Sequence, residues 1–154
     1  DEWTKIQGRF NDLPVNVAGE EQLNLISRAI EAEKPTKDIG AIAKKVAGSI
    51  LEQRPGASSD IAQTLEKCWP IHPIVACLLG TLSRRRFGQN QRSIFGFLNS
   101  AEPQGLQDFL RHASDGDLYG PELLWDYLQY NLEPSILASP DGHRWSLAVE
   151  AVQR

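Results

Sequence analysis

Cysteine and histidine are scarce in this sequence. Its 154 residues contain two cysteines, Cys68 and Cys77, and three histidines. Two cysteines are too few for a disulfide framework, and so few cysteines and histidines argue against a zinc site with several protein ligands. We therefore expect no metal site, and we expect both cysteines to be buried as small apolar residues.

Long apolar runs are also lacking. The longest, Ile74–Leu82, has half the length that a membrane-spanning helix needs. The chain opens with Asp1, Glu2 and Trp3 rather than with the basic and then apolar residues of a signal peptide. The sequence therefore predicts a cytoplasmic protein with no membrane partner.

Methionine is absent altogether, and residue 1 is not Met. Residues 149–154 end the chain inside what the pattern predicts to be a helix. Both features predict that the sequence is a piece of a longer polypeptide. The piece has the size of one domain, and its 41 % hydrophobic and 23 % charged residues are typical of a soluble globular protein.

The sequence motifs of common enzymes are missing as well. There is no phosphate-binding loop of the form G-x-x-x-x-G-K-[ST], no dinucleotide fingerprint, and no G-x-S-x-G, H-E-x-x-H or paired C-x-x-C motif. The nearest fragment to a phosphate loop, Gly88–Ser93, lacks the lysine and the preceding strand. We expect no complete ATPase or hydrolase site within the chain.

Two isolated polar features have both a structural and a functional interpretation. His72 is interpreted as a helix-capping or core histidine rather than a base, because no nucleophile or carboxylate accompanies it in the sequence. Asp115–Asp117 with Glu122 resembles a calcium loop, but the spacing is wrong for an EF-hand. A solvent-exposed loop is the favoured interpretation there.

Helical periodicity covers almost the whole chain. The clearest example is Asp38–Gln53, where apolar residues follow i, i+3, i+4 and i+7 until Arg54-Pro55-Gly56 ends the pattern. Strand signals are limited to one short stretch within Ile6–Val17 and to Pro140–Gly142, a possible turn between two extended pieces. The predicted fold is all-α, a multi-helix bundle with at most one short β-hairpin. Its other helices are predicted over Glu20–Glu33, Asp60–Lys67, Pro73–Arg86, Asn90–Leu98 and Gln104–His112, from Pro121, and from His143 or Trp145.

The predicted helix Pro73–Arg86 is apolar on all sides until its last turn. Such a helix is typical of the middle of a bundle, where neighbours cover every face. We therefore expect this helix to be central. The residues expected to be buried are Ile42, Val46, Ile50, Leu78, Leu79, Phe95, Leu98, Phe109, Tyr127 and Leu128.

Charge is distributed unevenly along a chain whose net charge is −4. Between Lys67 and Ala101 there is no Asp or Glu, and the basic residues there form a patch made of Arg84, Arg85, Arg86 and Arg92. Arginines at a helix C-terminus interact favourably with the helix dipole, which explains one or two of them structurally. Arg92 falls in the first turn of the next predicted helix, where an anion is favoured over a cation. The patch is therefore either phosphate-facing or a solvent-exposed or interdomain face.

The same region carries a resemblance to a known family. Cys68–Leu79 (C-W-P-I-H-P-I-V-A-C-L-L) and Leu82–Leu98 (L-S-R-R-R-F-G-Q-N-Q-R-S-I-F-G-F-L) resemble a segment of large bacterial P-loop ATPases of the AAA+/STAND type. The usual forms in that family are Y-P-L-H-P-L-T-A-x-L-L and R-R-F-G-Q-N-E-R-S-L-F-S-F-L. Trp3–Phe10 and Ser139–Trp145 are similar to the same proteins. The resemblance thus spans nearly the whole chain.

The resemblance implies a helical lid-type domain of a larger ATP-binding protein. Residues 1–19 would be a linker from the missing nucleotide-binding core, which is the implied partner, and residues 20–154 a single helical bundle. ATP and Mg²⁺ would be bound by the parent protein, so the fragment alone binds no cofactor and is not catalytic. In such relatives a lid arginine contacts the terminal phosphate of the nucleotide. Arg92 is the first candidate and Arg86 the second, and Gln91, where the family commonly has Glu, removes a charge beside Arg92.

Two other functions compete with an accessory domain. The first is a nucleic-acid-binding module in which the Arg84–Arg92 cluster contacts phosphates, although the net charge of −4 argues mildly against it. The second is a protein-interaction module, which an exposed apolar patch including Trp125, Tyr130 or Trp145 would favour.

Overall fold

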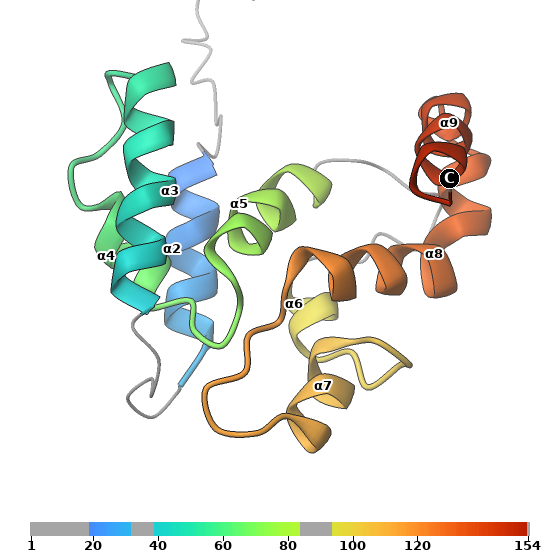
Figure 1. Cartoon of the computed structure of the whole chain (residues 1–154), viewed down its shortest axis with the longest axis horizontal. Helices are drawn as coiled ribbons and strands as arrows, with labels where there is room; N and C mark the ends of the chain where they lie inside the picture. Colours follow the sequence, from blue (N-terminus) through green and yellow to red (C-terminus); the bar gives the residue numbers. More distant parts are fainter. Residues whose placement is uncertain (1–18, 32–38, 84–93, 154) are drawn as a thin grey trace, which may run out of the picture.

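The computed structural model describes residues 19–31, 39–83 and 94–153, and within them it contains helices and turns but no strand. The helices α2 to α9 follow one another along the chain and pack into one helical assembly (Figure 1). The prediction of an all-α fold is therefore confirmed. In this described part of the chain, no helix is long and apolar enough to cross a membrane.

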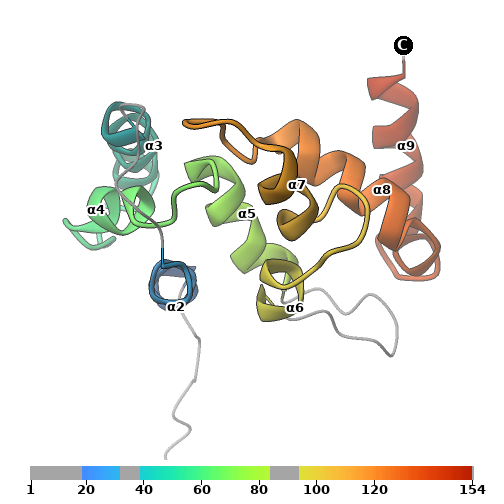
Figure 2. The same cartoon turned by 90° about the horizontal axis from the view of Figure 1, so that it is seen from below.

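The N-terminal half consists of α2 (Gly19–Ala29), α3 (Ile39–Gln53) and α4 (Ile61–Glu66). Glu20 and Glu21 lie in the first turn of α2, where acidic side chains interact favourably with the helix dipole. Helix α3 packs along α4, and α2 contacts both α4 and α5 (Figures 1 and 2). The sequence predicted α3 and α4 to within one residue at each end, whereas α2 ends four residues earlier than predicted.

Helix α5 (Pro73–Leu82) begins where the sequence predicts. His72 is its N-cap, because the imidazole Nδ1 accepts a hydrogen bond from the backbone N–H of Ile74 at 3.2 Å. Pro73 occupies the first helical position, where a missing N–H costs nothing. The capping interpretation of His72 is confirmed. The helix ends at Leu82 with Ser83 as its C-cap, earlier than the predicted end at Arg86, and residues 84–86 lie outside the described residues.

Helix α5 joins the two halves of the molecule, since it contacts α2, α3 and α4 on one side and α8 on the other (Figure 2). Its buried side chains include Val75, Ala76 and Leu79. Ile74 and Leu78, however, expose 43 % and 42 % of their surface. The prediction that neighbours cover this helix on every face is therefore wrong: α2, α3, α4 and α8 leave one apolar side open.

The C-terminal half contains α6 (Ile94–Leu98), α7 (Leu106–His112), α8 (Pro121–Leu137) and α9 (Gly142–Val152). The short helices α6 and α7 pack against each other, and the long helix α8 leads to α9 at the far end of the molecule (Figures 1 and 2). Pro121 at the first position of α8 agrees with the prediction.

The turn between α8 and α9 is tight. The N–H of Gly142 donates to the carbonyl of Ser139 at 3.0 Å, and a Cβ at Gly142 would overlap the carbonyl oxygen of Leu137. The prediction of extended pieces around Pro140–Gly142 is wrong, because helices flank this turn on both sides. The other stretch predicted to be extended, Ile6–Val17, lies outside the described residues.

Two tryptophans hold α9 against α8. The rings of Trp125 and Trp145 stack with centroids 4.7 Å apart and planes 24° from parallel. The indole Nε1–H of Trp145 donates to the carboxylate of Glu133 at 3.0 Å. Both tryptophans are half-buried, so of the three aromatic residues proposed for an exposed patch only Tyr130, which is 71 % exposed, is largely open to solvent.

A short backbone bridge ties the segment before α5 to the segment before α8. The N–H of Tyr119 donates to the carbonyl of Pro70 at 2.9 Å, and the N–H of His72 donates to the carbonyl of Tyr119 at 3.0 Å. The peptide bond between Trp69 and Pro70 is cis. These bonds satisfy backbone groups at the centre of the molecule, where water is excluded.

One continuous apolar core runs through both halves. Tyr119 is fully buried in it, with its ring edge-to-face against Phe97 and Phe109 at centroid distances of 5.4 and 5.5 Å. The predicted burial of Leu79, Leu98 and Tyr127 is confirmed, that of Leu78 is wrong, and the side chain of Phe95 lies outside what the structure describes. Four of the remaining predicted core residues are partly buried against this cluster: Val46, Ile50, Phe109 and Leu128. Ile42 is also partly buried.

Candidate functional site

The arginines proposed from the sequence lie outside the described residues. Arg84, Arg85, Arg86 and Arg92 fall between the C-cap of α5 at Ser83 and the start of α6. Their proposed contact with phosphate therefore stays a prediction. Within the described residues, the candidate site is the open side of α5, the helix that precedes these arginines in the chain.

That open side of α5 forms one wall of a groove whose opposite wall is α3. The groove has a volume of about 880 Å³, and residues at the N-terminal ends of α2 and α4 also line it. We call it the α3–α5 groove. Its apolar lining residues are Leu23, Ile42, Val46, Ile50, Ile61, Ile74, Cys77 and Leu78.

The groove lies between two strips of apolar residues, one on α3 and one on α5. On α3, Ile42, Val46 and Ile50 are spaced one turn apart and form a strip beside the residues that contact α4. On α5, Ile74 and Leu78 form a second strip one turn long. Because the two strips border the groove without filling it, apolar surface remains accessible.

Three charged side chains line the groove: Glu20, Lys45 and Arg54. The carboxylate of Glu20 is already engaged, since its Oε1 accepts a hydrogen bond from the backbone N–H of Ser58 at 3.0 Å. Lys45 and Arg54 line the groove from α3 and from the residue after it, and both are exposed. Within residues 19–31, 39–83 and 94–153, neither cation has a side-chain ion pair or hydrogen bond. A neutral N–H does not cancel the charge of Glu20, so these three side chains together carry a net charge of +1, and both cations lie on exposed side chains.

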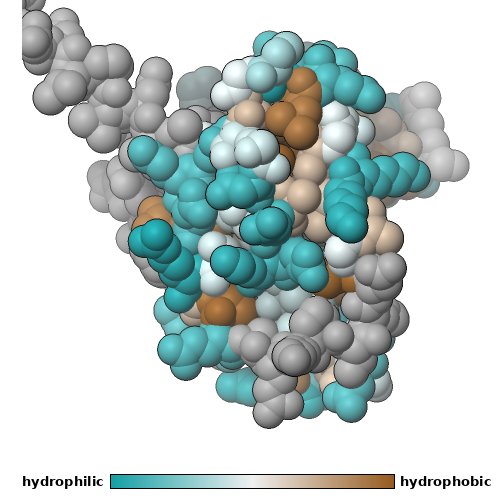
Figure 3. Space-filling view, turned by 90° about the vertical axis from the view of Figure 1, so that its left-hand side faces the viewer, coloured by the Kyte–Doolittle hydropathy of each residue, from teal (hydrophilic) through white to brown (hydrophobic). Residues whose placement is uncertain are grey.

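The outer surface around α3 and α4 is mostly hydrophilic. On that side of the molecule, apolar residues reach the surface in separate patches among hydrophilic ones (Figure 3). Isolated apolar patches are ordinary on a protein surface. The α3–α5 groove differs from them because its apolar residues line one continuous depression.

Of the two cysteines, only Cys77 lines this groove. Cys68 is fully buried, and its thiol lies 3.3 Å from the carbonyl oxygen of Thr64, whereas Cys77 is half-buried and lines the groove. Burial raises the pKa of Cys68 to about 12, with a smaller contribution from Cys77. Burial also raises the pKa of the Cys77 thiol. Protonated thiols are poor nucleophiles, so this pair supplies no reactive centre at neutral pH. The prediction that cysteine is buried is confirmed for Cys68 and only in part for Cys77.

The raised pKa of Cys68 predicts a loss of stability at alkaline pH. The folded thiol keeps its proton up to about pH 12, whereas the unfolded thiol loses it above about pH 9, so ionisation there favours unfolding. The stabilisation is complete below pH 9 and is lost as the pH rises. We expect the free energy of unfolding to fall by about 1 kcal/mol between pH 9 and 10 on account of this thiol.

Urea unfolding at pH 8, 9 and 10 measures this effect. Cys68→Ala should reduce the fall between pH 9 and 10, and the remainder should come partly from Cys77, whose pKa is raised for the same reason. A fall of equal size in the wild type and in Cys68→Ala would contradict the assignment. Tyr119, whose pKa burial also raises, contributes only above about pH 10.

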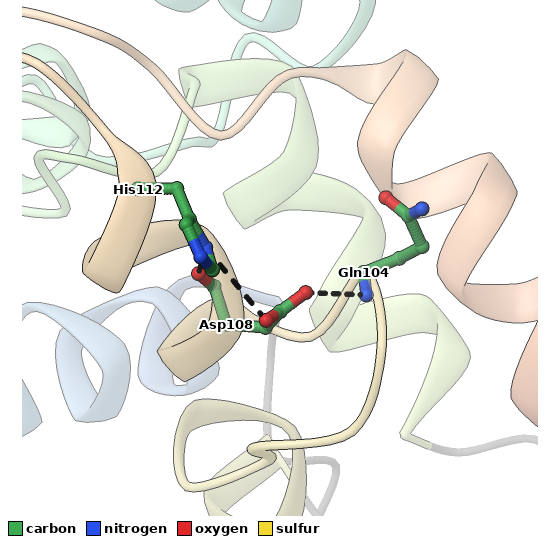
Figure 4. Close-up of polar contacts among 3 residues, drawn as sticks. All are labelled: Gln104, Asp108 and His112. Carbon is green, nitrogen blue, oxygen red and sulfur yellow. Dashed lines mark hydrogen bonds and ion pairs between the residues drawn. The ribbon is translucent and has the colours of Figure 1, made fainter.

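An acid–histidine pair lies on α7. Asp108 accepts a hydrogen bond from the backbone N–H of Gln104 at 3.1 Å, and its Oδ1 is 3.8 Å from Nδ1 of His112 (Figure 4). Gln104 has a positive φ of 67°, and its carbonyl accepts a hydrogen bond from the hydroxyl of Tyr119. The His112 side chain is 78 % exposed. Asp108 therefore holds the turn that leads into α7, and the exposed pair has the geometry of a surface contact rather than of a catalytic one.

The loop proposed as an alternative calcium site is a hydrogen-bonded turn. The carboxylate of Asp117 accepts from the backbone N–H of Ser114 at 2.9 Å, and Gly116 has a φ of 84°, which favours glycine. In the part of the chain that the structure describes, no three His, Cys, Asp or Glu side chains are grouped closely enough to hold a metal ion.

Neither the groove nor its two cations stands out in the amino-acid sequence. The available signal is an excess of apolar positions: α5 has more apolar residues than one buried face requires. Which of its faces stays uncovered depends on contacts with distant segments, so the periodicity alone does not locate the groove.

No protein-family model matches this chain, and no curated protein or solved structure matches it either.

Proposed function

We propose that this chain is an accessory helical domain of a larger bacterial ATP-binding protein, where it acts by binding a protein partner rather than by catalysis. The observation that carries the proposal is the open apolar side of α5, where Ile74 and Leu78 are more than two-fifths exposed. Exposed apolar surface in a continuous depression favours a binding partner. Helix α5 also belongs to the segment that resembles the AAA+/STAND-type ATPases, which supports the ATPase context.

In this proposal the domain couples the nucleotide state of the core to a partner, as a lid does. ATP and Mg²⁺ bind to the core, in the cytoplasm, and Arg92 or Arg86 reaches the terminal phosphate from the lid side. A guanidinium group suits that role because it stays charged and donates two parallel hydrogen bonds to phosphate oxygens. The core supplies the phosphate-binding loop, which this sequence lacks.

The first test is the reading frame of the encoding gene. An in-frame G-x-x-x-x-G-K-[ST] loop upstream of residue 1 is the expected finding. An encoding gene without such a loop would overturn the ATPase context, since this sequence contains no phosphate-binding loop of its own.

We further expect the purified chain alone to show no ATP turnover. The physical reason is that positioning and charge stabilisation of the phosphates require the missing loop and the bound Mg²⁺. Phosphate release is measured with the wild type and with Arg92→Ala. Turnover by the wild type that Arg92→Ala abolishes would contradict the prediction, whereas turnover unchanged by the substitution identifies a contaminating ATPase.

A nucleic-acid-binding module is the alternative, and the acid-free stretch between Lys67 and Ala101 favours it. Binding through arginine–phosphate contacts weakens steeply with salt, with a log–log slope of about 0.9 per neutralised phosphate. Titration of a labelled single-stranded oligonucleotide at about 50 and 200 mM salt measures that slope. Binding that is absent, or that does not change with salt, favours the accessory-domain proposal.

A further inference from the structure

The lining of the α3–α5 groove carries information about its occupant. Its floor is apolar, and the two charged side chains without a partner within the described residues, Lys45 and Arg54, are both cations. Lys45 lies on the wall formed by α3, and Arg54 lies just beyond the end of that wall. An occupant that covers the apolar floor therefore meets positive charge at two separate points along its length.

The dimensions of the groove suit an α-helix. On α3 the lining extends from Ile42 to Gln53, twelve residues that span about 18 Å. A partner helix of about three turns has the same length. Ile74 and Leu78 on the facing wall are one turn apart, which matches apolar residues at i and i+4 of such a helix.

The polar groups of the groove are poorly arranged for a small polar ligand. His72 uses its Nδ1 to cap α5, Glu20 holds the N–H of Ser58, and the hydroxyl of Ser49 donates to the carbonyl of Lys45. Small-molecule sites usually have a few polar groups that converge on the ligand. Here the free charges lie on exposed side chains, as in the rim of a protein interface.

We infer that the α3–α5 groove binds an amphipathic α-helix of a protein partner, with an apolar face against the floor and acidic residues paired with Lys45 and Arg54. The inference rests on the proposed function, because it names the partner chemistry of the same open side of α5. It requires no contribution from the arginines of residues 84–92.

The probe is a fluorescein-labelled helical peptide of about 15 residues, which forms about four turns. It has leucines at i, i+3, i+7 and i+10 and glutamates on the flanking positions, and a second peptide has lysine in place of every glutamate. Fluorescence anisotropy measures binding of both peptides to the full chain at low and moderate salt. We expect saturable binding of the acidic peptide only, and its affinity should fall with salt.

The chain offers matched control variants. Leu78→Ala in the groove is compared with Leu110→Ala on α7, because the two leucines are 42 % and 44 % exposed. Lys45→Glu is compared with Lys44→Glu, its exposed neighbour on α3 that does not line the groove. We expect the groove variants to weaken binding about tenfold and the controls to leave it unchanged. Circular dichroism of each variant checks that the fold is retained.

Several results would overturn the inference. These are equal binding of the acidic and basic peptides, equal effects of Leu78→Ala and Leu110→Ala, and no binding of either peptide. Displacement of the acidic peptide by dodecanoate at stoichiometric amounts would assign the groove to an alkyl carboxylate, and a dimer that Leu78→Ala dissociates would assign it to a second copy.

If the gene encodes a phosphate-binding loop but the peptide does not bind, the proposed function stands and this inference fails. If the peptide binds but the gene encodes no such loop, the inference stands and the ATPase context fails.

Discussion

Under the proposed function, Arg92→Ala is expected to lower ATP turnover by about 10³-fold in a protein that contains this domain together with a nucleotide-binding core. Negative charge on the terminal phosphate must be stabilised during phosphoryl transfer, and an arginine that reaches it supplies that stabilisation. Arg92 is the first candidate because no acidic residue between Lys67 and Ala101 neutralises it locally. The measurement is steady-state phosphate release at saturating ATP.

Three further variants test the charge, the geometry and the position of the proposed contact. Arg92→Lys keeps the positive charge but loses the planar, two-pronged donor arrangement, so we expect it to recover only part of the turnover. Arg84→Ala removes a member of the same basic patch that is not assigned to the nucleotide, and we expect it to retain turnover. Arg86→Ala tests the second candidate in the same assay.

The competing structural role makes an opposite forecast for Arg92→Ala. If Arg92 forms a closed pair with a carboxylate such as Glu102 or Asp108, its removal leaves that carboxylate without its partner and destabilises the domain by about 3–5 kcal/mol. Activity would then be lost only as far as the protein unfolds. A thermal melt of Arg92→Ala distinguishes the two roles: an unchanged melting temperature with lost turnover supports the contact with phosphate, and a loss of turnover that tracks unfolding contradicts it.

Leu79→Ala is expected to lower the free energy of unfolding by about 2–5 kcal/mol, whereas Leu78→Ala should cost less than about 1 kcal/mol. Leu79 is 5 % exposed and belongs to the apolar core, while its neighbour Leu78 is 42 % exposed and lines the groove. Truncation of the buried side chain leaves a cavity in addition to the lost apolar contact. Truncation of the exposed one removes contacts on a single side.

Urea unfolding of the two variants measures the difference directly. The pair is well matched, because both changes remove the same atoms from adjacent positions of α5 and carry the same change in helix propensity. Equal losses of stability would contradict the orientation of α5 described above. A much larger loss for Leu78→Ala would mean that a neighbour covers the side of α5 that is open among the described residues.

The sequence by itself determined where the helices lie and how several of them begin. Apolar residues at i, i+3, i+4 and i+7 located α3, and Arg54-Pro55-Gly56 located its end, because both depend on residues within a few positions of each other. The cap by His72 and the first-turn positions of Pro73 and Pro121 were equally predictable. Each of these features depends on local backbone geometry and on nearby hydrogen bonds.

A clear apolar stripe predicted burial only in part, since Ile42, Val46 and Ile50 of α3 are partly buried and line the groove. Where a helix is apolar on every face, the pattern did not determine burial at all. The pattern of α5 favoured burial of both Leu78 and Leu79, and it contains nothing that ranks them. The packing of α2, α4 and α8 around α5 decided that Leu79 is buried and Leu78 is not. Hydrophobicity sets the preference of a side chain for burial, but the number of surfaces available to cover it is a property of the whole fold.

Tertiary structure alone also decided which distant residues meet. The hydrogen bonds between the segment around Pro70 and Tyr119 join positions almost fifty residues apart, and no local pattern encodes them. In the same way, Lys45 and Arg54 line one groove together with Ile74 and Leu78 only because α3 and α5 both pack against α4. The sequence determined the helices and their apolar faces, whereas the positioning of those helices determined the groove, because a depression exists only where separate elements approach without filling the space between them.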